Sequence, residues 1–431
     1  MSRRGQQASA DRPAPRLEER QYWEGVEWVK YSVDPMTAPT NGERHDPARP
    51  FSPTVPDAGA ALPAGNDPAA GKHAPPPQQG DPRWLILGPH GLRAGWSILL
   101  FVVLLYFFAN VIGTILSSVV RGFFPVGLEG GTAGSSIVSE GAWVLALALT
   151  LAILSRLELR RFVDYYLAGP AVGARFLAGL VSGFAALSVL VGLLMWGGWI
   201  HFGPANHESG VLLYAGLWAI GFLFVGLTEE GCFRCYLQFT LARGVNFWWA
   251  VAVVGGMCLW DITHSSSHGA GGVYAMAGLG VLPCLYLQLH KAPRSGFWQA
   301  AWVSSTLFGF IHTGNNGETW IGIFAAAAIG FVFCVSVRLT GSAWWAIGCH
   351  TGWDWAETYF YGTADSGFVA HGHLFTTTPA GSVLWSGGSD GPEGSLLVLP
   401  VILLLLCALL VMYGRKRQAQ GSAALAETVA D

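Results

Sequence analysis

The stretch that decides the fold is VLLYAGLWAIGFLFVGLTEEGCFRCYLQFTLA, Val211 to Ala242. It is long and apolar enough to cross a bilayer as a helix, yet Glu229, Glu230 and Arg234 interrupt it within six positions. An ionised side chain at the centre of a bilayer costs about 3 kcal/mol on insertion scales. We therefore expect a functional site here, with a structural ion pair near the lipid headgroups as the alternative.

Helical geometry separates the three ionisable residues. Glu230 and Arg234 are four positions apart, so they share a helix face and are expected to form an ion pair. Glu229 lies about 100° around the helix from Glu230 and faces another direction. Glu229 is therefore the freer carboxylate and the better candidate for a general base that activates water.

The composition of the chain is typical of a polytopic membrane protein. Of its 431 residues, 52% are hydrophobic and 12% are charged, whereas globular proteins have about 25% charged residues. The formal net charge of −3 and the lack of a basic stripe argue against a nucleic-acid partner. The seven cysteines lie within or beside apolar segments and do not form a disulfide framework; the pair Cys232 and Cys235 lacks a second cysteine pair and a thioredoxin-like context.

The fold class predicted from these features is an all-α polytopic membrane protein with about ten transmembrane helices and a disordered N-terminal tail. The tail covers residues 1–82, which are rich in Pro, Gly and Ala; within it, the aromatic-rich segment Leu17 to Tyr31 is a candidate for docking on a partner or on the membrane surface. The apolar segments lie near 96–118, 137–155, 174–200, 210–240, 246–263, 271–290, 296–312, 319–338, 343–361 and 395–413.

Positive charge predicts the orientation of these helices. Lys and Arg follow the second, fourth, sixth, eighth and last apolar segments, and only Arg121 departs from this pattern. By the positive-inside rule, both termini of this multi-pass cell-membrane protein are expected in the cytoplasm. The alternate connections contain no Lys or Arg: 201–210, 263–271, 313–318 and the extracytoplasmic loop 362–394. This last loop is expected to be a plain connector, and the alternative is that it covers the site from outside.

Two further stretches place ionisable residues in apolar helices. In STLFGFIHTGNNGETW, Phe308 and His312 are four residues apart, and in GSAWWAIGCHTGWDWAE, His350 and Asp354 have the same spacing. A lone histidine in an apolar helix is usually a packed core residue. Two histidines together with a carboxylate pair indicate a site where these side chains converge.

The order of these motifs resembles the CPBP membrane proteases, the family that includes type II CAAX prenyl endopeptidases and bacteriocin-processing or self-immunity proteins. The motifs EExxxR, FxxxH and HxxxD extend over roughly 210–361, after N-terminal helices in 83–209 and before a last helix and basic tail in 395–431. The resemblance implies that Glu229 and His312 activate water, that Glu230 supports the site, and that His350 and Asp354 stabilise the oxyanion. The catalytic set that the resemblance implies is Glu229, Glu230, Arg234, His312, His350 and Asp354.

Asp354 stands where the family often has Asn. An ionised Asp354 would repel an oxyanion, so it is expected to be protonated, to orient His350 or to bind a metal. Glu229, His312 and His350 are also a familiar zinc set, and the sequence leaves open whether water is bound by one Zn²⁺ or held by Glu229 and His312 alone.

The distance between the first two motifs is larger than the family's usual spacing. We expect a helical hairpin near 246–290 to be inserted there, because Phe308 and the distance from His312 to His350 fit the family pattern. His264, in the sequence Trp260-x-x-x-His264, is the alternative for the second motif. Asp261, His264 and His268 are an alternative metal site.

The sequence thus predicts an intramembrane endopeptidase that cleaves a membrane-associated peptide, either a CAAX-type prenylated peptide or a leader peptide. Its expected partners are the lipid bilayer and that substrate. The alternatives are a non-catalytic membrane scaffold or partner-binding protein and a proton-coupled transporter, since buried carboxylates and histidines also mark ion paths. A transporter would be expected to have paired halves with broken helices, and the sequence shows no such repeat.

Overall fold

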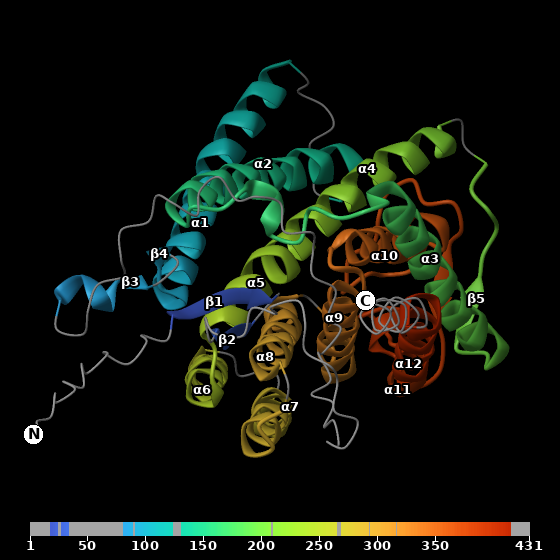
Figure 1. Cartoon of the computed structure of the whole chain (residues 1–431). Coiled ribbons are helices and arrows are strands. Elements are labelled where there is room, and N and C mark those ends of the chain that lie inside the picture. The colour runs from blue at the N-terminus through green and yellow to red at the C-terminus, as the bar shows by residue number, and fades with distance from the viewer. Residues whose placement is uncertain are drawn as a thin grey trace, which may run out of the picture.

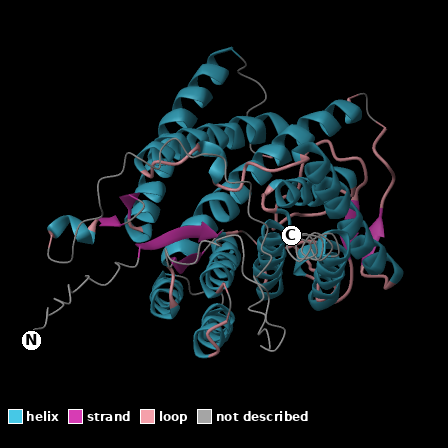
Figure 2. Ribbon diagram, viewed as in Figure 1, coloured by secondary structure: helices cyan, strands magenta, loops and turns pink. Residues whose placement is uncertain are grey.

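A computed structural model describes residues 18–24, 27–33, 81–88, 91–123, 131–207, 210–264, 269–292, 294–315 and 317–414. Helices dominate this part of the chain (Figure 2). Five of its helices are long and apolar enough to cross a membrane, and three shorter apolar helices accompany them. The predicted all-α fold of an integral membrane protein is therefore confirmed.

All ten predicted apolar segments are helical. The fourth segment continues from α4 through a π-helix into α5, and the ninth and tenth also end in π-helices. The helices are α1 (Ala94–Phe123), α2 (Ala133–Leu157), α3 (Val172–Trp196), α4 (Val211–Glu230), α5 (Gln238–Gly244), α6 (Phe247–His264), α7 (Gly269–Leu289), α8 (Ser295–Ile311), α9 (Trp320–Thr340), α10 (Trp344–Asp354), α11 (Val383–Ser386) and α12 (Val398–Leu409). Short 3₁₀ helices are η1 (Pro82–Leu85), η2 (Phe162–Asp164), η4 (His312–Gly314) and η6 (Pro392–Gly394), and the π-helices are η3 (Gly231–Leu237), η5 (Trp355–Phe360) and η7 (Leu410–Gly414).

Three short antiparallel strand pairs complete the structure. They are β1 (Glu18–Glu24) with β2 (Glu27–Val33), β3 (Leu87–Gly88) with β4 (Gly91–Leu92), and β5 (Ile200–Phe202) with β6 (Thr377–Pro379). The first pair lies within the predicted N-terminal tail, and its register sets Trp23 opposite Trp28 and Tyr22 opposite Val29. The rest of the predicted tail up to residue 80 and the basic tail from residue 415 lie outside the described residues.

The helix α10 lies at the centre of the membrane domain, beside α3 and α4 (Figure 1). Glycines on both helices allow the backbones of α3 and α10 to touch. A Cβ atom at Gly179 or Gly183 would collide with a carbonyl of α10, and one at Gly348 or Gly352 would collide with a carbonyl of α3. Such small-residue contacts are typical of tightly packed membrane helices, and they fix the position of the helix that bears His350 and Asp354.

The π-helices η3 and η5 differ from the uninterrupted α-helices that we expected. Both lie at a motif: η3 begins after Glu230, within the first motif, and contains Arg234, whereas η5 begins directly after Asp354, the end of the last motif. A π turn widens the helix by one residue, so it shifts the side chains that follow around the helix axis. Such turns occur often at functional sites.

The hairpin predicted near 246–290 is present as α6 and α7. These two helices pack against each other and against α8, at the edge of the molecule away from α3 and α12 (Figure 1). That this hairpin is an insertion relative to the family remains a prediction.

Candidate active site

The buried ion pair predicted at the end of α4 is present. Arg234 Nε lies 3.2 Å from Glu230 Oε2, and Arg234 Nη1 donates to Glu230 Oε1 at 3.3 Å. Both side chains are completely buried. Because each ion compensates the other, this pair keeps two charges inside an apolar helix bundle.

Aromatic rings enclose the guanidinium group of this pair. Its central carbon lies 4.1 Å from the ring centre of Phe308 and 5.2 Å from that of Phe333. Aromatic faces attract a cation and take the place of the water that Arg234 has lost. Phe308, the first residue of the predicted FxxxH motif, therefore packs directly on the Arg of the first motif.

His350 joins the motif on α10 to the carboxylates at the end of α4. Its Nδ1 lies 2.9 Å from Glu230 Oε1, and since an ionised carboxylate only accepts hydrogen bonds, Nδ1 is the donor. Its Nε2 then faces two other acids, Asp354 Oδ2 at 3.4 Å and Glu229 Oε2 at 3.8 Å. Glu230 thus orients a histidine that is 120 residues away in sequence.

Glu229 differs from Glu230 in exposure. The Glu229 side chain is 31% exposed, whereas that of Glu230 is completely buried. Glu229 Oε2 makes no hydrogen bond within the described residues. The structure therefore leaves Glu229 as the carboxylate with free hydrogen-bonding capacity, as its position on the helix predicted.

His312 stands at the end of α8 and is partly buried. Its Nδ1 donates to the backbone carbonyl of Phe308 at 2.7 Å, which leaves Nε2 of the neutral ring as an acceptor. Within the described residues, no hydrogen bond or ion pair joins His312 to Glu229 or His350. Five of the six predicted site residues thus form one contact network, and His312 reaches the same cavity separately.

That cavity has a volume of about 370 Å³. Its polar lining includes Glu229, His312, His350 and Asp354, together with Glu140, Asn315, Asp365, Ser366 and Glu393. Apolar residues from α4, α9 and α12 line the remainder. Carboxylates and imidazoles are therefore gathered in a hollow surrounded by membrane helices, which is the environment that acid and base catalysis of hydrolysis requires.

A family model described as type II CAAX prenyl endopeptidase Rce1-like matches residues 284–356. The matched segment runs from α7 to η5 and contains both His312 and His350. Residues 284–356 are therefore similar to an Rce1-like domain. The resemblance to the CPBP membrane proteases is thereby confirmed, and this family implies a protease. The chain has no significant match among curated proteins or solved structures.

The first motif lies outside the Rce1-like domain, because Glu229, Glu230 and Arg234 precede residue 284 in the sequence. The structure brings that motif against the domain through the contacts of Glu230 with His350 and of Arg234 with Phe308. Long-range contacts of this kind have no signal in the spacing of residues along one helix.

The sequence analysis missed three acids that line the cavity beside the Rce1-like domain: Glu140 on α2, and Asp365 and Glu393 in the loop after η5. Glu140 is a lone acid in an apolar helix, and that position alone is a signal that points to function. Asp365 and Glu393 lie in the loop 362–394, so this loop contributes to the lining of the cavity.

In this structure, the three residues predicted to bind zinc are too far apart to hold one ion. Ligands of one zinc ion lie at about 2.0–2.2 Å from it and so within about 4 Å of each other. Glu229, His312 and His350 all line the cavity, but they do not form a described group whose ligand atoms lie within 4.8 Å of one another. This arrangement does not fit a single zinc ion held by those three residues.

The alternative sites from the sequence lie elsewhere. Asp261 is buried at the end of α6 and lines a small separate cavity with Thr313 and Trp320. The side chains of His264 and His268 lie outside the described residues. All seven cysteines, including Cys232 and Cys235, are free thiols.

Proposed function

We propose that the chain is an intramembrane endopeptidase that hydrolyses a peptide bond of a membrane-associated substrate. The observation that supports it most directly is that Glu229 lines the same cavity as His312 and His350, the two histidines of the segment that matches the family model. Buried acids and histidines in membrane helices are costly and are usually functional. A scaffold would not need them.

In the proposed reaction, Glu229 is the general base. It takes a proton from water as the water oxygen attacks the peptide carbonyl, and it later returns that proton to the leaving amine, so that a carboxylic acid and an amine are formed. His312 accepts a hydrogen bond from the same water through Nε2, because its Nδ1 is already bound to the carbonyl of Phe308.

His350 is proposed to stabilise the oxyanion. Its Nδ1–H is held by Glu230, and its Nε2–H is directed to the substrate oxygen. Asp354 is proposed to orient the ring, one of the three roles left open by the sequence, and its Oδ2 lies 3.4 Å from Nε2. Arg234 keeps Glu230 in place and has no direct part in the reaction.

The substrate is proposed to have an apolar anchor. A second cavity of about 440 Å³ lies between α7, α8, α9 and α12, and its lining is nearly all apolar. Ile402 borders both this cavity and the catalytic one. A CAAX-type prenylated peptide would fit this pair of cavities, with its isoprenoid in the apolar one and its scissile bond near Glu229. In the cell, the lipid bilayer is the proposed partner and both termini are proposed to be cytoplasmic.

The test is cleavage of anchored peptides by the purified full chain in detergent. Prenylated peptides, the same peptides without the lipid, and leader-type peptides are incubated with the wild type, with Glu229→Gln and with Asp164→Asn. Asp164 is a surface acid paired with Arg161, so its variant is a matched control for losing a carboxylate. Cleavage by the wild type and by Asp164→Asn, but not by Glu229→Gln, supports the proposal. No cleavage of any peptide by a folded wild type favours the scaffold.

A further inference from the structure

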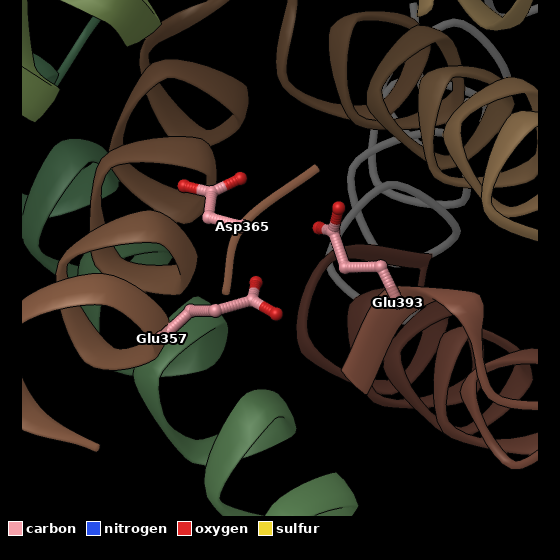
Figure 3. A group of neighbouring side chains, drawn as sticks. All are labelled: Glu357, Asp365 and Glu393. Carbon is pink, nitrogen blue, oxygen red and sulfur yellow. The ribbon is translucent and has the colours of Figure 1, made fainter. Parts of the chain in front are cut away.

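Three carboxylates from separate segments gather at the cavity wall. Glu357 projects from η5, Asp365 from the loop after it, and Glu393 from η6, and Figure 3 shows the three side chains as neighbours. One oxygen of each lies within 4.8 Å of one oxygen of both others. The catalytic motifs include none of these residues.

The hydrogen bonds of this cluster come from uncharged donors. Trp353 Nε1 donates to Glu357 Oε2 at 2.9 Å and to Glu393 Oε1 at 2.7 Å. Thr358 donates to Asp365 Oδ2 at 2.9 Å. Within the part of the chain that the structure describes, no Lys or Arg forms an ion pair with any of the three. Three acids therefore share one indole N–H and weak hydroxyl donors.

One carboxylate oxygen of the cluster is buried without a hydrogen-bond partner. The side chain of Glu357 is completely buried, and its Oε1 has no hydrogen-bond partner within the described residues. Figure 3 shows the Glu357 carboxylate extended toward Asp365 and Glu393. A buried carboxylate oxygen without a donor or a cation is expensive, and repulsion by two neighbouring acids increases that cost.

We propose that Glu357, Asp365 and Glu393 bind a divalent cation of the calcium class. All of their ligand atoms are oxygens, the type preferred by hard cations, with no nitrogen or sulfur that would favour zinc. Oxygens on opposite sides of Ca²⁺ are about 5 Å apart, which matches the spread of the cluster. The ligands come from a π-helix, a loop and a short 3₁₀ helix, and such separate segments suit the flexible coordination of Ca²⁺ better than a rigid octahedron.

The bound cation would stabilise the wall of the catalytic cavity. Asp365, Glu393 and Trp353 line that cavity, and Glu357 is three residues after Asp354 on the same continuous helix. Binding would tie this helix to the loop and to η6, so it would order the wall opposite Glu229. This inference goes beyond the proposed peptidase activity and can be tested without it.

The test is direct binding of Ca²⁺ to the full chain in detergent after removal of metals with a chelator. Isothermal titration and thermal unfolding are measured with Ca²⁺, Mg²⁺ and Zn²⁺ for the wild type, Glu357→Gln and Glu393→Gln. Glu140→Gln is the matched control, because Glu140 is also a partly buried acid on the cavity but lies outside the cluster.

The wild type and Glu140→Gln should bind one Ca²⁺, with an affinity in the range of about 10⁻⁴ M or tighter, and should melt at higher temperature when Ca²⁺ is present. Glu357→Gln and Glu393→Gln should lose at least about tenfold in affinity. Without Ca²⁺, each should be more stable than the metal-free wild type, because each removes a repelling charge; a merely structural carboxylate would give the opposite result. No binding by the wild type, unchanged binding by Glu357→Gln, or binding of Mg²⁺ or Zn²⁺ but not Ca²⁺ would overturn the proposal.

Discussion

Replacing Arg234 by Met should destabilise the protein strongly. Arg234 and Glu230 are both fully buried, with 3.2 Å between Nε and Oε2, so the substitution leaves a buried carboxylate without its cation. Removing one partner of a buried ion pair costs about 3–5 kcal/mol. The loss of the contact between the guanidinium and Phe308 at 4.1 Å adds to this cost.

The double variant Glu230→Gln/Arg234→Met separates these effects. Because it removes both charges, it should be more stable than Arg234→Met alone, and the cycle should give a coupling of about 2 kcal/mol or more. The free energy of unfolding of the four proteins is measured by denaturation in the same detergent. Additive effects of the two substitutions, or a change below about 1 kcal/mol for Arg234→Met, would contradict a buried, mutually compensating pair.

Two other predictions concern the helix interface and a loop acid. Gly183→Ala should destabilise by at least about 1–3 kcal/mol, because its Cβ would meet the carbonyl of Cys349 in α10, whereas Gly192→Ala, with open space around it, should be neutral or slightly stabilising; thermal unfolding compares the two. Burial, with repulsion by Asp390, raises the pKa of Glu318 to about 8. Because the folded chain then holds a proton that the unfolded chain releases near its ordinary pKa, wild-type stability should fall as pH rises from about 5 to about 8, and Glu318→Gln should reduce this slope. Equal slopes for the two proteins would refute that reasoning.

The sequence predicted the helices well because membrane spans are set by long apolar runs, which are local. It also predicted the pair of Glu230 and Arg234, since residues four apart on a helix are neighbours. It did not predict the π turns after Glu230 and Asp354, because a shift of one backbone hydrogen bond leaves the hydropathy pattern unchanged. Nor did it predict that Phe308 encloses Arg234.

The contacts of the loop 362–394 could not be predicted from the sequence. Asp365 and Glu393 meet Glu357 only because the loop folds back over the end of α10, and the spacing of these acids in sequence has no period that indicates it.

In the proposed reaction, Glu229 activates the water that cleaves the peptide bond. The rate of cleavage of one anchored peptide is measured for Glu229→Gln and for wild type under identical conditions, with thermal unfolding of both. We expect a rate at least about 100-fold lower for Glu229→Gln with an unchanged melting temperature, because the amide preserves the shape of the side chain but is not a base. Cleavage by Glu229→Gln at the wild-type rate would contradict this role of Glu229.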